Sequence, residues 1–195
     1  MQFSRRKVMI LVAFAISGID IARAQNAVDK LQPLVELSAH RLALAEQVAF
    51  AKWDSHTSVE DPSREAQVIM SAVKESKSRG LDGTFVSKFF AAQIEANKAV
   101  QYSLLANWYR TGRAPNHASI NLANTIRPEL DQLQRALIAE LADTATIRAG
   151  TTCHTDLAKA AGKYMSSYKG DRRCLHAIAL DRALAAACTA LKTRE

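Results

Sequence analysis

Apolar residues recur at helical spacing along most of the chain, and the first regular run covers residues 33–53. One face of this run is marked by side chains three or four residues apart: Leu34, Leu37, Arg41, Leu44, Val48 and Lys52. Such spacing places all of them on the same side of an α-helix, where they would be buried. The run therefore predicts a long core helix, with Pro33 tolerated in its first turn.

Two residues of this apolar face are cations. Arg41 and Lys52 are eleven residues apart, so they point the same way about 16 Å from each other along the helix axis. Neither has an acid three or four residues away, where a partner on the same helix would lie. Each alone could extend to solvent or pair with another helix. For both on one face, an anionic ligand is the better explanation.

A second helix is predicted to begin at Asp61, as its N-cap, with Pro62 in the first helical position, and to end at Gly80. Its first turn contains Arg64 and Glu65. The helix dipole favours Glu65 there and disfavours Arg64. Arg64 could be a solvated surface residue, but an anion bound at this helix start would interact with both its guanidinium and the dipole.

A third helix is predicted from Asp82 to about Tyr109, and two neutral amides interrupt its apolar face. That face consists of Phe90, Ile94, Asn97, Gln101, Leu104 and Trp108. Asn97 and Gln101 are one turn apart, so they could hydrogen-bond each other as ordinary structure. Alternatively, they line a polar cavity that faces the first helix.

The rest of the chain predicts further helices and contains one more candidate residue, Arg127. Residues 111–124 read as a loop or an irregular crossing, and Arg127 precedes Pro128 at the start of an amphipathic helix, where it could be a solvated cation. Two more helices are expected at residues 154–168 and 172–192, with a break at Gly170. We therefore expect an all-α single domain of about six helices, in which three long core helices enclose the active site.

Composition agrees with this fold class. Hydrophobic residues make up 48% of the 195 positions and charged residues 23%, which is typical of a globular chain rather than a disordered one. Only 7 Gly and 4 Pro are present, too few for the many turns of an all-β sandwich or barrel.

The N-terminus has the features of a secretory signal peptide. Arg5, Arg6 and Lys7 precede an apolar run over residues 8–19, and Ala22-Arg23-Ala24 forms a small-x-small cleavage pattern. We expect residues 1–24 to be removed and the domain to comprise residues 25–195, in the periplasm or secreted, by either the general or the twin-arginine route. A buried first helix is the alternative reading of this segment.

Cleavage would lower the formal net charge from +7 to +4, because it removes four cations and one acid. That modest charge argues against a nucleic-acid partner, since each phosphate contact needs its own cation. No run reaches the roughly 18 apolar residues of a membrane span, so no membrane association is expected after cleavage. Export also permits a disulfide among Cys153, Cys174 and Cys188.

Several of these positions occur together, in the same order, in a known family. They are Arg41-Leu42-Ala43 with Phe50-Ala51-Lys52-Trp53, Val59-Glu60-Asp61 with Arg64, Gln93-Ile94 with Gln101-Tyr102-Ser103, and Arg127 before Leu130-Asp131-Gln132-Leu133. In this set the chain resembles the all-helical chorismate mutases, specifically their secreted subclass. The resemblance covers most of residues 25–195 and is weak after Asp143.

The resemblance implies a homodimer that rearranges chorismate to prephenate without a metal or cofactor. It implies that Arg41, Arg64 and Arg127 hold the two substrate carboxylates, and that Lys52 and Gln101 contact the ether oxygen. Other implied substrate contacts involve the backbone of Asp61 and, in cytosolic relatives, the acid at the position of Glu65. Asn97 stands where the family has a small hydroxyl residue. The resemblance also favours a Cys153–Cys188 disulfide and leaves Cys174 as the odd thiol.

Two other functions are compatible with parts of this sequence. A periplasmic helical binding or adaptor protein could grip a carboxylate ligand without turnover, and would bind chorismate without forming prephenate. A metal protein could use Cys153, His154, Cys174 and His176, although their spacing fits no usual zinc pattern. No Ser-His-Asp or Cys-His nucleophile set emerges, which agrees with a unimolecular rearrangement.

Overall fold

The computed structural model describes residues 9–189, with side chains from residue 25 onward. Within this range the chain forms seven α-helices and no strands: α1 (Met9–Ser55), α2 (Pro62–Ser76), α3 (Gly83–Thr111), α4 (Arg127–Asp143), α5 (Ala145–Arg148), α6 (Cys153–Ser167) and α7 (Arg173–Leu184). The prediction of an all-α domain is confirmed. Among the described residues, no helix combines the length and apolar character needed to cross a membrane. Arg5, Arg6 and Lys7 of the predicted signal peptide lie outside the described residues.

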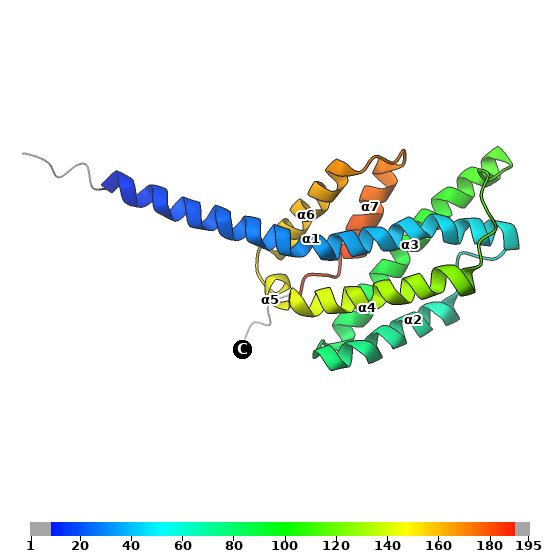
Figure 1. Cartoon of the computed structure of the whole chain (residues 1–195), viewed down its shortest axis with the longest axis horizontal. Helices are drawn as coiled ribbons and strands as arrows, with labels where there is room; N and C mark the ends of the chain where they lie inside the picture. Colours follow the sequence, from blue (N-terminus) through cyan, green and yellow to red (C-terminus); the bar gives the residue numbers. More distant parts are fainter. Residues whose placement is uncertain (1–8, 190–195) are drawn as a thin grey trace, which may run out of the picture.

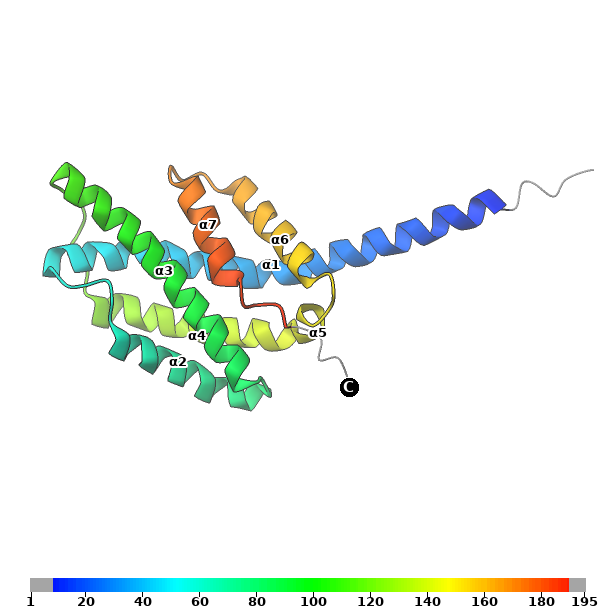
Figure 2. The ribbon, with the colours of Figure 1, turned by 180° about the vertical axis from the view of Figure 1, so that it is seen from behind.

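The long helix α1 organises the domain. It packs against α3, α4, α6 and α7, while α2 packs against α3 and α4 (Figures 1 and 2). The α6–α7 pair therefore covers one side of α1 and α3, and α2 and α4 cover another. Fully buried side chains at these contacts include Leu31, Leu34, Phe89, Phe90 and Trp108.

α1 begins much earlier than the sequence pattern predicted. The expected start near Pro33 was wrong, because the helix runs continuously from Met9 and contains Pro33 in its interior. A proline there removes one backbone hydrogen bond. Val28 and Leu31 before it, and Leu34 after it, are buried in the same core, and this packing holds both flanks in helical register. In both views the N-terminal end of α1 extends away from the rest of the domain (Figures 1 and 2).

The predicted ends of α2 and α3 agree with the structure. The Asp61 carboxylate accepts a hydrogen bond from the Arg64 N–H at 3.1 Å, and the Asp82 carboxylate accepts one from the Phe85 N–H at 2.8 Å. After α2, a short 3₁₀ turn (Lys77–Arg79) leads to Gly80, whose φ of +69° places it in the left-handed region. The predicted Asp61 cap, the start of the third helix at Asp82 and the glycine stop are thus confirmed.

The irregular crossing that follows α3 ends in a π-helical turn. Residues 112–121 are extended or irregular, and Leu122–Ile126 form the π-helical turn that leads into α4. His117 anchors the crossing to α1: its ring stacks on Phe50 with centroids 4.1 Å apart, and its Nε2 lies 3.0 Å from Asp54 Oδ2.

The C-terminal end also differs from the prediction. The short helix α5 was not predicted. The last helix was expected at residues 172–192, but α7 ends at Leu184. Residues 190–192 of the expected helix lie outside the described range. The chain then turns so that Cys188 forms a disulfide with Cys153, with a Cα–Cα distance of 5.9 Å. The disulfide predicted from the family resemblance is confirmed, and Cys174 is an exposed free cysteine.

Candidate active site

A pocket lies between α1, α2, α3 and α4, and all eight site residues named from the sequence line it. They come from four helices and the segment that joins α1 to α2: Arg41, Lys52, Asp61, Arg64, Glu65, Asn97, Gln101 and Arg127. Apolar side chains, among them Val48, Val59 and Ile94, form the rest of the wall together with Lys98, Asp131 and Gln134. Residues 41 to 134 of one chain therefore contribute a single continuous lining.

Arg41 is a buried cation without an acid partner. Arg41 is only 5% exposed, and its Nε has no hydrogen-bond partner among the described residues. None of the ion pairs found within residues 25–189 includes Arg41. Burial lowers the pKa of Arg41 to about 10, partly offset by Asp131. It remains charged at neutral pH, so the pocket contains an uncompensated positive charge.

Lys52 occupies the other end of the same α1 face and is oriented by backbone carbonyls. Its Nζ donates to the carbonyl oxygens of Ser58 and Val59, at 2.8 and 2.6 Å. Burial lowers the pKa of Lys52, while the carboxylates of Asp61, Glu65 and Glu60 act in the opposite direction. An ammonium group has three N–H donors. These two bonds therefore leave one donor for a ligand in the pocket.

Asn97 and Gln101 form a fixed hydrogen-bonded pair on α3. The Asn97 amide nitrogen donates to the backbone carbonyl of Arg41 at 3.0 Å, which directs its oxygen toward the next turn of the helix. Gln101 Nε2 then donates to Asn97 Oδ1 at 2.7 Å. Gln101 Oε1 is buried and has no hydrogen-bond partner among the described residues. The amide of Gln101 is thus oriented by a relay that begins at the backbone of α1.

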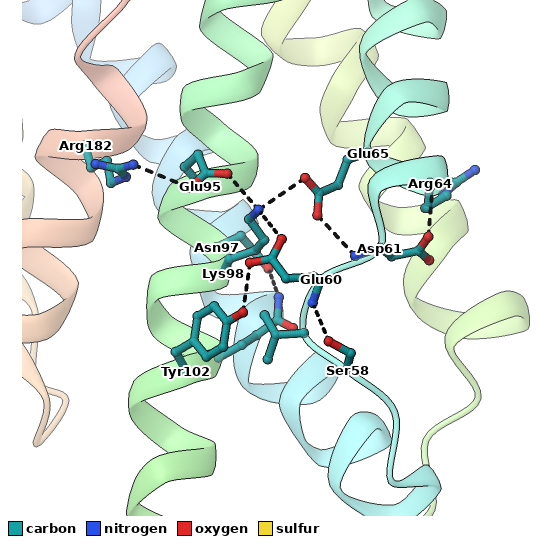
Figure 3. Close-up of polar contacts among 12 residues, drawn as sticks. Ser58, Glu60, Asp61, Arg64, Glu65, Glu95, Asn97, Lys98, Tyr102 and Arg182 are labelled. Carbon is teal, nitrogen blue, oxygen red and sulfur yellow. Dashed lines mark hydrogen bonds and ion pairs between the residues drawn. The ribbon is translucent and has the colours of Figure 1, made fainter.

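The start of α2 contributes three charged residues with separate partners. Asp61 caps the helix through Arg64 N–H, and its own N–H donates to Glu65 Oε1 at 3.3 Å. Glu65 Oε2 lies 3.2 Å from the Lys98 ammonium (Figure 3). Arg64 Nη2 is 3.7 Å from Asp131 Oδ1, a long contact at the surface that leaves its guanidinium donors available.

Arg127 is the residue of α4 that was predicted for the site, and it lines the pocket. It is the first residue of α4, directly after the π-helical turn, whose start is capped by the Asn121 side chain accepting from Asn124 N–H at 3.0 Å. Arg127 is exposed but lines the pocket. The turn therefore determines where this guanidinium lies relative to Arg41 and Arg64.

The lining is suited to binding and orienting a small molecule with carboxylate groups. Arginine guanidiniums can grip carboxylates through two parallel hydrogen bonds. Among the described residues that line the pocket there is no Ser, Thr, Cys or His, so the wall offers no hydroxyl, thiol or imidazole nucleophile. What it offers is fixed positive charge and amide donors, which can stabilise negative charge that develops during a reaction.

Comparison with known proteins identifies the family. Residues 26–102 match the family described as chorismate mutase type II. The secreted chorismate mutase of Mycolicibacterium smegmatis is 31% identical to this chain over 150 residues, which cover 77% of this chain and 82% of that protein. The chain belongs to the secreted chorismate mutase family.

Solved structures agree with this assignment. A chorismate mutase from Burkholderia phymatum has 42% sequence identity and a TM-score of 0.80, covering 84% of this chain and 98% of that one. One from Burkholderia thailandensis has 36% identity and a TM-score of 0.77, covering 82% of this chain and 99% of that one. The chain thus shares its all-helical fold with these two chorismate mutases.

Three polar residues of this chorismate mutase pocket were not assigned to the site from the sequence: Asp131, Gln134 and, with the most ion pairs, Lys98. Its side chain is 11% exposed, and its ammonium contacts Glu60 at 2.7 Å, Glu95 at 2.7 Å and Glu65 at 3.2 Å (Figure 3). Burial opposes the charged form of Lys98, but the three carboxylates outweigh it and raise its pKa. Of its three acidic partners only Glu95, three residues earlier, lies on the same helix, so it alone could have indicated an ion pair from the local sequence.

The metal-site alternative loses one of its ligands. Cys153 forms a disulfide with Cys188, so its sulfur is not available as a thiolate beside His154. Without it, the set proposed from the sequence reduces to Cys174, His154 and His176, and no group of three or more metal-ligating side chains is found among the described residues.

Proposed function

We propose that this protein is a chorismate mutase, which converts chorismate to prephenate by an intramolecular rearrangement within the pocket described above. The observation that carries the proposal is Arg41: a buried arginine, without an acid partner, that lines one pocket with Lys52 and Gln101. Burying such a cation is costly unless a ligand anion completes its interactions. Chorismate carries two carboxylates and meets that requirement.

The three arginines bind these carboxylates and select the reactive conformer. Arg41, Arg64 and Arg127 approach the pocket from α1, α2 and α4. Holding both carboxylates brings the two carbon atoms that will bond close together, which removes most of the entropic part of the barrier. The grip needs no general base, nucleophile or metal, because the reaction is a rearrangement within one molecule.

Lys52 and Gln101 act at the ether oxygen. As the carbon–oxygen bond breaks ahead of carbon–carbon bond formation, negative charge develops on that oxygen. The remaining N–H of the Lys52 ammonium and an N–H of the Gln101 amide would donate to it, and both groups are already oriented before substrate binds. Preorganised donors of this kind stabilise a transition state more than the ground state.

Asp61, Glu65 and Asn97 complete the site. Glu65 accepts from the Asp61 N–H and from Lys98, and its remaining lone pairs would accept the substrate hydroxyl next to the Asp61 backbone. Asn97 orients Gln101 through the relay from the Arg41 carbonyl. We assign this orienting role to Asn97 in place of the carboxylate contact made by the small hydroxyl residue of the family pattern.

Location and assembly are part of the proposal. Relatives of this chain are named secreted chorismate mutases, and residues 1–24 would be the signal peptide that directs export. The described core residues, of which Val28 is the first, all lie in the part of the chain that would remain after cleavage before Gln25. We also propose a homodimer in which each protomer carries its own pocket, as the family resemblance implies, with Arg127 of the same chain supplying the third arginine.

The test is loss of chorismate absorbance with purified protein comprising residues 25–195, followed by chemical identification of prephenate. Saturable chorismate binding without prephenate would favour a binding or adaptor protein instead. The intact mass of protein purified from its native source tests export, since retention of residues 1–24 would contradict cleavage. Light scattering of the same protein measures the oligomeric state.

A further inference from the structure

The direction of the Lys52 ammonium depends on the segment that joins α1 to α2. Two of the three Lys52 N–H donors are taken by the carbonyl oxygens of Ser58 and Val59. Where those carbonyls lie therefore fixes where the third donor points. Val59 is buried and lines the pocket, whereas Ser58 and Glu60 on either side of it are exposed.

This segment is attached to α3 through Glu60. One Glu60 carboxylate oxygen lies 2.7 Å from Lys98 Nζ, and the other accepts a hydrogen bond from the Tyr102 hydroxyl at 2.8 Å (Figure 3). The Glu60 N–H also donates to the Ser58 hydroxyl at 3.1 Å, which tightens the turn beside the two carbonyls. Glu60 itself does not line the pocket.

The attachment persists at neutral pH. Hydrogen bonds from Lys98 and Tyr102 lower the pKa of Glu60, and the surrounding carboxylates raise the pKa of Lys98 despite its burial. Both partners are therefore charged. Because Lys98 lies on α3 three residues before Gln101, the same helix carries the Gln101 donor and the anchor of the Lys52 segment.

We propose that Glu60 is a positioning residue for the rearrangement: by binding Lys98 and Tyr102 of α3, it holds the Ser58 and Val59 carbonyls where they direct Lys52 at the substrate. Both donors to the breaking bond are thereby positioned by α3. Gln101 belongs to this helix, and Lys52 is held relative to it through Glu60. The inference rests on the proposed function, because it requires Lys52 to act on the substrate.

The test compares Glu60→Ala with Glu95→Ala as a matched control. Both carboxylates contact Lys98 and both side chains are 45% exposed, but Glu95 lies within α3 and does not hold the joining segment. A displacement of a catalytic group by about 1 Å can cost about 100-fold in rate. We expect Glu60→Ala to lower kcat about 10- to 100-fold with KM changed less than about 3-fold, and Glu95→Ala to leave both close to wild type.

Tyr102→Phe provides a second arm that removes one anchor without changing any charge. It should lower kcat by a smaller factor than Glu60→Ala, in a protein whose circular dichroism and thermal unfolding match wild type. Unchanged kcat in both Glu60→Ala and Tyr102→Phe would overturn the inference. So would an equal loss in Glu95→Ala, because that loss would come from Lys98 and not from the segment.

A double-mutant cycle separates positioning from a general structural effect. If Glu60 acts through Lys52, Glu60→Ala should cause little further loss of kcat in a Lys52→Ala background, because changes that act through one group are not additive. Multiplicative losses would overturn the inference while leaving the proposed function intact. Absence of prephenate formation by the wild-type protein would instead refute the proposed function itself.

Discussion

Two buried arginines in this protein have opposite surroundings. Arg148 donates to the Thr144 hydroxyl at 3.2 Å, to the Ala187 carbonyl at 2.8 Å and to the Leu141 carbonyl, and it lies over the Phe85 ring at 4.5 Å. Arg41 is buried to a similar degree, yet its Nε has no partner among the described residues. Burial lowers the pKa of each to about 10, so both are cations at neutral pH.

The difference separates a structural end of the domain from a functional one. At the α5 end, each donor group of Arg148 has an acceptor, and the disulfide holds the adjoining tail. At the pocket end, Arg41, Lys52 and Gln101 retain unfilled hydrogen-bonding capacity. An unfilled buried polar group costs about 1–3 kcal/mol. We interpret that cost as stability given up in exchange for a preorganised binding site, and mutations at the two ends should therefore have different consequences.

The largest expected effect is at the pocket end. Lys52→Ala should lower kcat about 100- to 1000-fold, equivalent to about 3–4 kcal/mol, because it removes a preorganised donor to the oxygen that becomes negative. The free energy of unfolding should change little, since Lys52 is only half buried. Steady-state kinetics measures the change in kcat, and urea unfolding measures the change in the free energy of unfolding. A variant that keeps most of its activity would remove Lys52 from the mechanism.

At the structural end, loss of the disulfide should act on stability alone. Replacing Cys153 and Cys188 together by serine opens a loop of 35 residues and should lower the free energy of unfolding by about 3–4 kcal/mol in the chain-entropy model. Chorismate turnover at a temperature where the variant is folded should be close to wild type. Cys174→Ser is the control, because that cysteine is exposed and forms no disulfide.

The two arginines give the most direct comparison. Arg148→Met leaves three oxygen acceptors without their donor and should cost about 2–4 kcal/mol of stability. Arg41→Met removes an uncompensated charge, so stability should stay the same or rise, while KM for chorismate rises at least about 10-fold. Thermal unfolding and steady-state kinetics of both variants measure this. Equal destabilisation by the two substitutions would show that Arg41 has structural partners after all.

The sequence predicted those features of the site that are determined by residues close to one another along the chain. Helical periodicity put Arg41 and Lys52 on one face of α1, and Asn97 and Gln101 on one face of α3, because residues three and four apart share a face. The Asp61 cap was predicted because its donor, the Arg64 N–H, lies only three residues away along the chain. The family resemblance then ordered these positions into one site, and all of them line one pocket.

What the sequence could not predict depends on contacts between distant residues. Lys98 binds Glu60 and Glu65, which precede it by 38 and 33 residues. From the sequence of its own helix, Lys98 would be expected to be an ordinary exposed lysine. α7 ends early because Cys188 is drawn to Cys153 and the Thr189 N–H donates to the Arg148 carbonyl at 2.9 Å. α1 continues through Pro33 because the core buries both flanks, which the local helix rules do not include.

A subtler change at the pocket end concerns the identity of residue 101. Gln101→Glu should be about 10- to 100-fold slower than wild type at neutral pH, because an ionised carboxylate cannot donate to the ether oxygen and repels the charge forming there. Activity should recover as the pH falls through the pKa of the new carboxyl group, since only its protonated form donates. The wild-type amide does not titrate, so its rate should vary little across the neutral range. Rate–pH profiles of the two proteins check this, and equal activity at neutral pH would mean that residue 101 does not face the breaking bond.

The smallest expected effect concerns His117, which lies near the pocket end but has its hydrogen bonds filled. Its bonds to the Pro115 carbonyl and the Asp54 carboxylate raise the pKa of its imidazole in the folded protein. A raised folded-state pKa means that the stabilisation is fully present below the ordinary histidine value of about 6.5 and is lost as the pH rises through the raised value.

His117→Gln removes the titration and keeps a side chain that can hydrogen-bond. The difference in free energy of unfolding between wild type and this variant should therefore be larger at pH 5.5 than at pH 8, by no more than the roughly 1 kcal/mol that partly exposed ion pairs contribute. If filled bonds mark a structural residue wherever it lies, kcat for chorismate should change by less than about 3-fold at either pH. A large loss of kcat with unchanged stability would break the comparison, because a residue with filled bonds would then be acting on the reaction, through the crossing that leads to Arg127.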